Sequence, residues 1–119
     1  MTLLTDQTFQ VLNKALTAAS LRQQIIAHNI ANINTPNYKR AYVSFEESLK
    51  KALDSGRGVA QVQPQIKKDN RTAARLDGNN VNLEAEMTQL AMNSINYNLA
   101  VSRLNGKLNM LSYVINGGR

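Results

Sequence analysis

The stretch NIANINTPNYKR, residues 29–40, decides how the first part of this chain folds, because a helical pattern breaks off there at Thr35-Pro36. Proline has no N–H and disfavours helix at the residue before it, so the helix must end. Its last carbonyl groups then need other partners, and asparagine amides can both donate and accept hydrogen bonds. A purely local helix stop is the simpler alternative. We predict instead a helix-end motif that sets the direction in which the chain leaves the helix, made of Asn29, Asn32, Thr35, Pro36, Asn37 and Tyr38.

Apolar side chains precede this motif at heptad spacing. They fill two columns that are apolar except at Gln23, a pattern typical of a helix that packs along a seam. Asp6 suits the positive end of the helix dipole. The pattern predicts a helix from Asp6 to Ile33, with the seam residues Phe9, Leu12, Leu16, Ile26, Ile30 and Ile33.

The C-terminal part of the chain repeats the heptad pattern, with Ser94 as its one polar member. Asn82 is a suitable N-cap and Gly117-Gly118 ends the run, so the second predicted helix covers residues 83–115. Two such helices at the two ends of one chain pair most simply as an antiparallel coiled coil. The second helix supplies to this intrachain seam Leu83, Met87, Leu90, Tyr97, Val101, Leu104, Leu108, Leu111 and Ile115.

Both predicted helices carry a second apolar stripe on another face. A helix with two apolar faces needs neighbours on both sides. The middle of the chain could fold back over these stripes, but it has few large apolar side chains. We therefore expect other subunits to cover an intersubunit stripe that consists of Met92, Leu99, Tyr113, Val11 and Ile25.

The segment between the two helices has a different character. VSFEESLKKALDSG, residues 43–56, predicts a short amphipathic helix with a capping box of Ser44 and Glu47. Pro64 limits the following stretch to an edge strand or an extended loop, and Asp77-Gly78 indicates a turn. The sequence thus predicts an all-α fold in three parts: residues 1–38 with the first helix and its turn, 39–80 as a short helix plus a basic, partly extended or mobile connector, and 81–119 with the second helix.

The net charge of +6 is concentrated in the middle segment, where nine basic residues between Lys39 and Arg75 face four acidic ones. Because these residues are not interleaved with aromatic side chains, a solvated insert is the preferred interpretation. The chain has no Cys, and its single histidine, His28, falls on the outer side of the first helix. No nucleophile with a neighbouring base is visible. We expect no enzyme, no metal site and no cofactor.

Two stretches resemble the axial proteins of the bacterial flagellum, the rod and hook family. HNIANINTPNYKR, residues 28–40, is similar to the N-terminal signature of that family, and DGNNVNLEAEMTQLAMNSINYNLAVSRLNGKLNMLSYVI, residues 77–115, is similar to its C-terminal heptad helix. The short chain agrees best with the proximal rod members, since hook and distal-rod relatives have larger inserts. Asn37 stands where the family usually has glycine, and asparagine is the best substitute for glycine at a positive φ.

The resemblance implies a structural subunit that self-assembles by helix packing into the proximal rod, the torque-transmitting drive shaft of the flagellum. Its partners would be copies of itself, other axial rod proteins, basal-body ring and rod-adaptor proteins, and the flagellar type III export apparatus. Residues 1–8 lack the basic start and apolar run of a cleavable signal peptide, which fits export by that apparatus to the periplasm and cell envelope. No stretch approaches the roughly 20 apolar residues of a membrane span. We expect no membrane span and no nucleic acid partner.

Two other functions are compatible with the same residues. One is a cytosolic helical-hairpin module that binds an acidic partner or nucleic acid through residues 39–75, and its binding should weaken steeply with salt. The other is a chaperone-like adaptor built from the same hairpin, which would have to fold alone.

Overall fold

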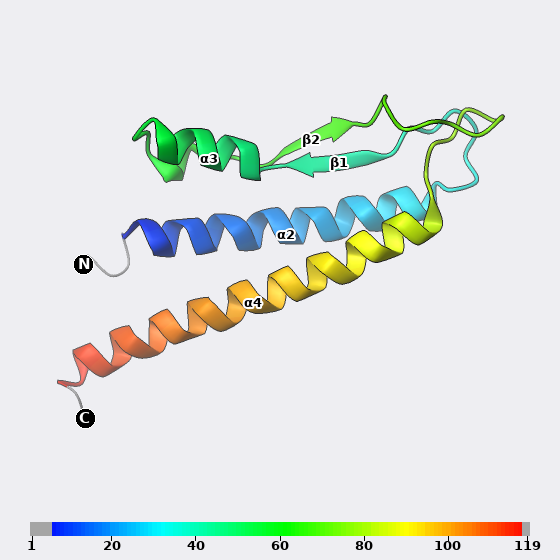
Figure 1. Cartoon of the computed structure of the whole chain (residues 1–119). Coiled ribbons are helices and arrows are strands. Elements are labelled where there is room, and N and C mark those ends of the chain that lie inside the picture. Colours follow the sequence, from blue (N-terminus) through cyan, green and yellow to red (C-terminus); the bar gives the residue numbers. More distant parts are fainter. Residues whose placement is uncertain (1–5, 118–119) are drawn as a thin grey trace.

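The computed structural model describes residues 6–117 of the chain. It contains two long antiparallel helices, with the middle segment lying along the side of the first helix that faces away from the second (Figure 1). The extents of the molecule are 64 × 31 × 14 Å. The elements in chain order are α2 (Gln7–Ala31), β1 (Ala41–Ser44), α3 (Glu46–Asp54), the 3₁₀ turn η1 (Val59–Gln61), β2 (Gln65–Lys68) and α4 (Leu83–Ile115).

The two long helices begin at the polar residues that local chemistry favours. The Asp6 carboxylate caps α2 by accepting a hydrogen bond from the Phe9 N–H at 2.7 Å. Asn82 caps α4 as predicted, because its side chain accepts from the Ala85 N–H at 3.0 Å. The predicted bounds of α4 are confirmed, whereas α2 ends at Ala31, two residues before the predicted end, with Asn32 as its C-cap.

The prediction of an all-α fold is wrong in the middle segment, where β1 and β2 form a two-stranded antiparallel sheet. Ser44 lies in β1 and pairs with Gln65, so it does not form the predicted capping box. The helix α3 begins after Phe45, which makes no side-chain capping bond. Phe45 is buried instead, so packing rather than capping fixes where α3 begins.

The hydrophobic core lies between α2 and the middle segment. Its buried members are Ala18, Phe45, Ala52 and Val62, with Ala15 and Leu49 packed around them. The middle segment therefore does cover one apolar face of α2. Val11 and Ile25, expected in the intersubunit stripe, are half-buried within the chain, and their contact with another subunit stays a prediction.

The seam between α2 and α4 uses a different side of α4 from the predicted one. Along α4, the residues that bond α2 include Glu86, Asn93 and Lys107, each one position before a member of the predicted heptad pattern. The α2 members of the predicted seam are buried or half-buried, as are Leu90, Val101, Leu104 and Leu111. The remaining predicted members of α4 are more than two-fifths exposed, and their place in the seam stays a prediction: Leu83, Met87, Tyr97, Leu108 and Ile115. Tyr97 does line clefts together with Leu16 and Ala19 of α2. Polar anchors hold α4 in this orientation, as the site below shows.

Candidate functional site

The end of α2 is built around the completely buried side chain of Asn29. Its Oδ1 accepts hydrogen bonds from the Ala41 N–H and the Tyr38 hydroxyl, both at 2.9 Å. Its Nδ2 donates to the Ala41 carbonyl at 2.8 Å and to Glu86 Oε2 at 3.3 Å. One amide thus uses its full hydrogen-bonding capacity to join α2, β1 and α4. We call the region where these three elements meet the helix-end joint, comprising residues 28–41 and 69–86.

The Thr-Pro stretch forms a tight turn that carries the chain from α2 to β1. Asn32 Nδ2 donates back to the His28 carbonyl at 2.9 Å, and the Thr35 hydroxyl donates to Asn32 Oδ1 at 3.1 Å. The Tyr38 N–H donates to the Thr35 carbonyl at 3.3 Å, which places Pro36 and Asn37 in the middle of the turn. Asn37 has a φ of 62°, as the expected glycine-like position requires.

Asn79 supplies the partners that the end of α2 needs. Its side chain is completely buried, and its Nδ2 donates to the carbonyls of Asn32, Ile33 and Thr35 at 2.9, 3.0 and 2.9 Å. The Arg75 guanidinium also donates to the Ile33 carbonyl. The carbonyls released by the helix end are therefore bonded to the loop before α4. Sequence reasoning missed Asn79, although it lies in the quoted DGNN stretch.

Asn80, the next residue, ties the same loop to the sheet. Its Oδ1 accepts from the Arg40 N–H and its Nδ2 donates to the Asp69 carbonyl, both at 2.7 Å. The Asn80 N–H donates to the Tyr38 carbonyl at 3.3 Å. Two consecutive asparagines thus connect the loop to the turn after α2 and to both strand ends. The joint is held by specific bonds between residues 40 or more positions apart in the sequence.

A buried charge network completes the helix-end joint. Glu86 in the first turn of α4 is only 1% exposed, and its Oε1 accepts from Arg40 Nε at 2.6 Å. Arg40 Nη1 also pairs with Asp69 Oδ2 at 3.1 Å. Because removal of one partner from a buried ion pair is strongly destabilising, this network makes the geometry of the joint specific.

The electrostatics of the joint follow from these contacts. Burial lowers the pKa of the Arg40 guanidinium, but its hydrogen bonds to Glu86 and Asp69 outweigh burial and raise that pKa overall. Hydrogen bonds from the Thr72 hydroxyl and N–H hold the pKa of the Asp69 carboxyl well below its usual range, with further support from Arg40. Burial, together with the Glu86 charge, raises the pKa of the Tyr38 hydroxyl. All three groups keep their usual charge states at neutral pH.

Three polar contacts set the register of α2 against α4. The Glu86–Asn29 contact lies at one end, and Asn93 Nδ2 donates to the Ala19 carbonyl at 2.9 Å near the middle. At the other end, Lys107 Nζ pairs with Asp6 Oδ2 at 2.6 Å. The three α4 residues are spaced by multiples of seven, so they occupy one column of the helix. A heptad search that counts only apolar residues cannot detect this column.

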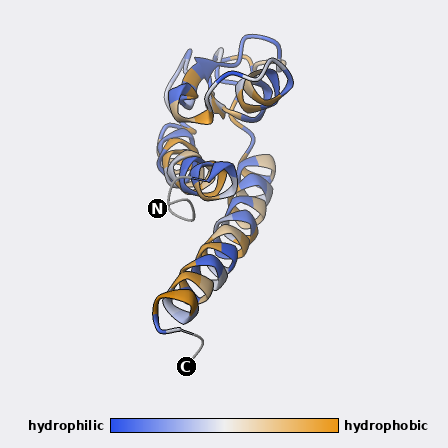
Figure 2. Cartoon of the chain, turned by 90° about the vertical axis from the view of Figure 1, so that its left-hand side faces the viewer, coloured by the Kyte–Doolittle hydropathy of each residue, from blue (hydrophilic) through white to orange (hydrophobic). Residues whose placement is uncertain are grey.

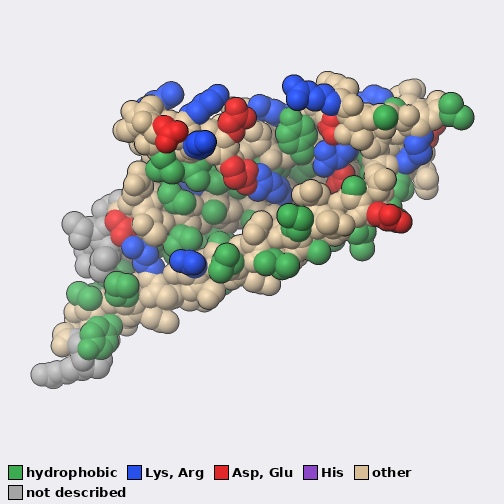
Figure 3. Space-filling model, in the orientation of Figure 1, with side chains coloured by type: hydrophobic (Ala, Val, Ile, Leu, Met, Phe, Trp, Pro, Cys, Tyr) green, Lys and Arg blue, Asp and Glu red, His purple; other side chains and the backbone are tan. Residues whose placement is uncertain are grey.

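Much of the apolar surface of α4 has no cover within the chain. Figure 2 marks hydrophobic residues along the ribbon of α4, and Figure 3 shows hydrophobic side chains on the visible face of this helix. The helix diverges from the remainder of the molecule toward its C-terminal end (Figure 1). Met92, Leu99 and Tyr113, predicted to form the intersubunit stripe, are 52%, 54% and 60% exposed. The exposed large apolar side chains of α4 are Leu83, Met87, Met92, Ile95, Tyr97, Leu99, Leu108, Met110, Tyr113, Val114 and Ile115.

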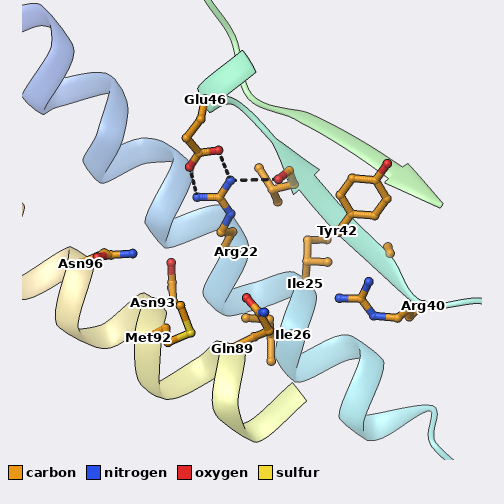
Figure 4. A pocket seen from close by; sticks show the side chains of 12 residues that line it. Arg22, Ile25, Ile26, Arg40, Tyr42, Glu46, Gln89, Met92, Asn93 and Asn96 are labelled. Carbon is orange, nitrogen blue, oxygen red and sulfur yellow. Dashed lines mark hydrogen bonds and ion pairs between the residues drawn. The ribbon is translucent and has the colours of Figure 1, made fainter. Parts of the chain in front are cut away.

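A cleft of about 400 Å³ lies between β1, α2 and α4 (Figure 4). On its β1 side, the Arg22 guanidinium bonds both oxygens of Glu46 at 2.5 Å and the Val43 carbonyl at 3.0 Å. The bond from Arg22 lowers the pKa of the Glu46 carboxyl. On the opposite side, Met92 and Asn93 project from α4. The charged side chains that line the cleft are thus already in ion pairs.

Neither catalytic nor metal chemistry is assembled in the part of the chain that the structure describes. His28 is exposed, and its ring lies 6.0 Å from that of Tyr38. Residues 6–117 contain no group of three or more His, Asp or Glu side chains that could hold a metal ion. Among the helices described, none is long and apolar enough to cross a membrane. The arrangement is one of structural joints and exposed apolar surface.

Known proteins resemble this chain along nearly its whole length. A family profile described as flagella basal body rod protein matches residues 9–39. The flagellar basal body rod protein FlgB of Bacillus subtilis is 41% identical, over 94% of this chain and 95% of its own length. The proteins of the same name from Escherichia coli and Borrelia hermsii are 30% and 32% identical, over 95% and 79% of this chain and 96% and 84% of their own lengths.

Proposed function

The chain belongs to the flagellar basal body rod proteins, in the group named FlgB, and we propose that it builds the proximal rod by self-assembly through helix packing. A member of this family is a structural subunit of the flagellum and not an enzyme, and its place is the flagellar basal body. It assembles there with other rod and basal-body proteins. The proposal adds the mechanism: α4 packs against neighbouring chains, and the packed helices transmit torque.

The observation that carries this proposal is the uncovered apolar surface of α4. Soluble monomers rarely leave large contiguous apolar patches in water, and such patches mark interfaces. Eleven large apolar side chains of one helix are at least two-fifths exposed. The middle segment lies on the far side of α2 from α4, so it does not cover them (Figure 1). Neighbouring subunits are the cover that a self-assembling protein provides.

The helix-end joint gives the proposed shaft its stiffness. Asn29, Asn79 and Glu86 bond the end of α2 to the beginning of α4 through completely or almost completely buried side chains. A turn held only by flexible contacts would let the two helices pivot about their connection. Because each buried polar group has its partner within the chain, pivoting would break bonds that water could not replace. The joint therefore passes a twist from one helix to the other.

The route to the basal body belongs to the same proposal. The chain is exported unfolded by the flagellar type III apparatus and folds with its neighbours in the cell envelope. Its remaining partners are the ring and rod-adaptor proteins next to the proximal rod. Family membership argues against a cytosolic nucleic-acid module and against a chaperone-like adaptor, because the relatives are named as basal body rod proteins.

The proposal is tested by making the exposed surface polar. In the double variant Met92→Gln with Leu99→Gln, the urea midpoint of the purified chain should stay unchanged, because both side chains are more than half exposed. Incorporation into basal bodies, measured in cells that lack the wild-type chain, should be lost. Leu76→Gln is the matched control, since Leu76 is fully exposed in the loop before α4 and should assemble normally. Normal assembly of the double α4 variant would refute the proposal.

A further inference from the structure

The two outer edges of the β1–β2 sheet differ in whether side chains bond their outward backbone groups. The edge of β1 is closed by side chains of α2: Asn29 bonds the N–H and carbonyl of Ala41, and Arg22 bonds the carbonyl of Val43. The edge of β2 has no such closure, and all four residues of β2 are exposed. Figure 1 shows β2 on the outside of the molecule, with β1 between it and α2. We propose that the free edge of β2 binds an acidic, extended segment of another protein, which adds to the sheet as a third strand.

The register of the sheet identifies the backbone groups available for such pairing. Beyond the last strand pair, Ala41 with Lys68, the Asp69 N–H donates to the Arg40 carbonyl at 2.8 Å. Because antiparallel partners alternate between bonded and non-bonded pairs, Lys67 and Gln65 are the bonded residues of β2. The N–H and carbonyl groups of Ile66 and Lys68 therefore point away from β1. Within residues 6–117 they have no hydrogen-bond partner.

Charge selects the kind of strand that fits this edge. Lys67 and Lys68 are exposed, and neither side chain makes an ion pair or hydrogen bond within the described part of the chain. They project from opposite faces of the strand, so acidic residues on either face of an added strand would meet a lysine. Ile66, which precedes them and shares a face of the strand with Lys68, is 55% exposed and offers apolar contact. The segment that fits is extended, acidic and carries an occasional apolar residue.

A second copy of this chain is a poor source of that segment. Outside residues 39–75 the chain has four acidic residues. Asp6 and Asp77 are ion-paired and Glu86 is buried, which leaves Glu84 alone. The observations also favour a protein over nucleic acid, because β2 has no aromatic side chain on which a base could stack. The partner is therefore a different protein.

The β2 strand is preorganised to accept a partner. Pro64 restricts the chain just before it, and the Asp69 carboxylate just after it accepts from the N–H groups of Arg71 and Thr72. Asn80 holds the Asp69 carbonyl at 2.7 Å, which anchors the strand to the helix-end joint. A strand already held in the bound conformation loses little entropy on pairing. This edge is separate from the apolar surface of α4, so the inference does not depend on the proposed mode of self-assembly.

The experiment uses the full chain, labelled with ¹⁵N, and a blocked peptide of about six residues that alternates Glu and Thr. On titration, amide exchange at Ile66 and Lys68 should slow by ~10-fold or more, while Gln65 and Lys67, already bonded to β1, should change little. A peptide with Lys in place of Glu, and a Glu peptide that is N-methylated at alternate residues, should both fail. The second peptide tests backbone pairing without any change to the protein.

Variants of the chain give the matching tests. Ile66→Pro removes an outward N–H but no bond to β1, and it should abolish binding of the Glu peptide. Lys67→Glu with Lys68→Glu should weaken binding by ~10-fold or more, whereas Lys50→Glu on the exposed side of α3 should not. Two results with the peptides would overturn the inference: no slowing of amide exchange at Ile66 and Lys68, or equal binding of the Lys peptide. A third would be amide chemical-shift changes of the same size with duplex DNA or phosphatidylglycerol vesicles, without slower exchange at alternate residues of β2.

Discussion

Asn29 and Asn79 both bond residues at the end of α2, and each is completely buried. Asn29 is part of the helix itself, so its place at the helix end could be predicted from its neighbours in the sequence. Asn79 reaches the same place from more than 40 residues away, and local patterns carry no information about such a contact. The same limit applies to Glu86, whose partner Arg40 lies 46 residues away.

Replacement of Asn79 by alanine tests how much its hydrogen bonds stabilise the end of α2. In Asn79→Ala the three carbonyls of Asn32, Ile33 and Thr35 lose a shared buried donor, and the free energy of unfolding should fall by about 2 kcal/mol. Urea unfolding followed by circular dichroism measures this loss. Asn34→Ala is the control, because Asn34 is exposed in the same turn and should change stability by less than about 0.5 kcal/mol.

Gly78 is required by both its backbone and its surroundings. It has a φ of 85°, and a Cβ there would stand 2.3 Å from Asn37 Oδ1 and 3.2 Å from the Asn37 backbone. Gly78→Ala should therefore destabilise the chain by about 2 kcal/mol in urea unfolding. Gly58→Ala makes the same chemical change at a φ of −66° with no atom within 4 Å, and it should be neutral or slightly stabilising. Equal effects of the two variants would contradict this account of the turn.

The carboxyl of Asp69 makes the stability of the joint depend on pH. Its folded-state pKa lies below the unfolded value of 3.8, because Thr72 and Arg40 stabilise the carboxylate. The stabilisation is therefore complete above pH 3.8 and is lost as the pH falls below it. Asp69→Asn should be less stable at neutral pH and should lose less stability between neutral and acid pH than the wild type. Asp54→Asn, at an exposed residue of α3, should follow the wild type in urea unfolding at each pH.

At the scale of the elements, the heptad period predicted two long helices and the bounds of α4, because helix caps act locally. It did not predict which side of α4 faces α2. Asn93 and Lys107 occupy the seam by bonding the Ala19 carbonyl and Asp6, and a purely apolar pattern places their neighbours there instead. The strand β1 was missed, whereas β2 lies in the stretch that was expected to be an edge strand or an extended loop. Four residues are too short to show a period, and the two strands pair across more than 20 positions.

Gly106 provides a test at this scale. It lies on the same column of α4 as Leu99 and Tyr113, seven positions from each, and a Cβ at this residue would meet no atom within 4 Å. Gly106→Ala should stabilise the isolated chain by about 0.5–1 kcal/mol, since glycine weakens a helix interior. In the assembled rod the added methyl group should hinder the close approach of a neighbouring helix. We expect a raised urea midpoint together with reduced incorporation into basal bodies; normal incorporation would mean that no neighbour packs at Gly106.

At the scale of the whole molecule, the chain is a thin, elongated body with apolar side chains buried on one side of α2 and exposed along α4. From the sequence we predicted more apolar surface than the chain itself can bury. Part of that surface was assigned to α2, where the middle segment covers it. Eleven of the fifteen exposed large apolar side chains of residues 6–117 lie on α4. Assembly should therefore change the environment of α4 more than that of the core between α2 and the middle segment.

The most direct measurement is thiol labelling of single-cysteine variants, since the wild-type chain has no Cys. Leu99→Cys and Tyr113→Cys should react rapidly in the purified chain and at least ~10-fold more slowly in isolated basal bodies, where neighbours cover α4. Val59→Cys, at a residue only 2% exposed, should be slow in both states. Equally rapid labelling of Leu99→Cys and Tyr113→Cys before and after assembly would contradict the claim that neighbouring subunits bury this surface.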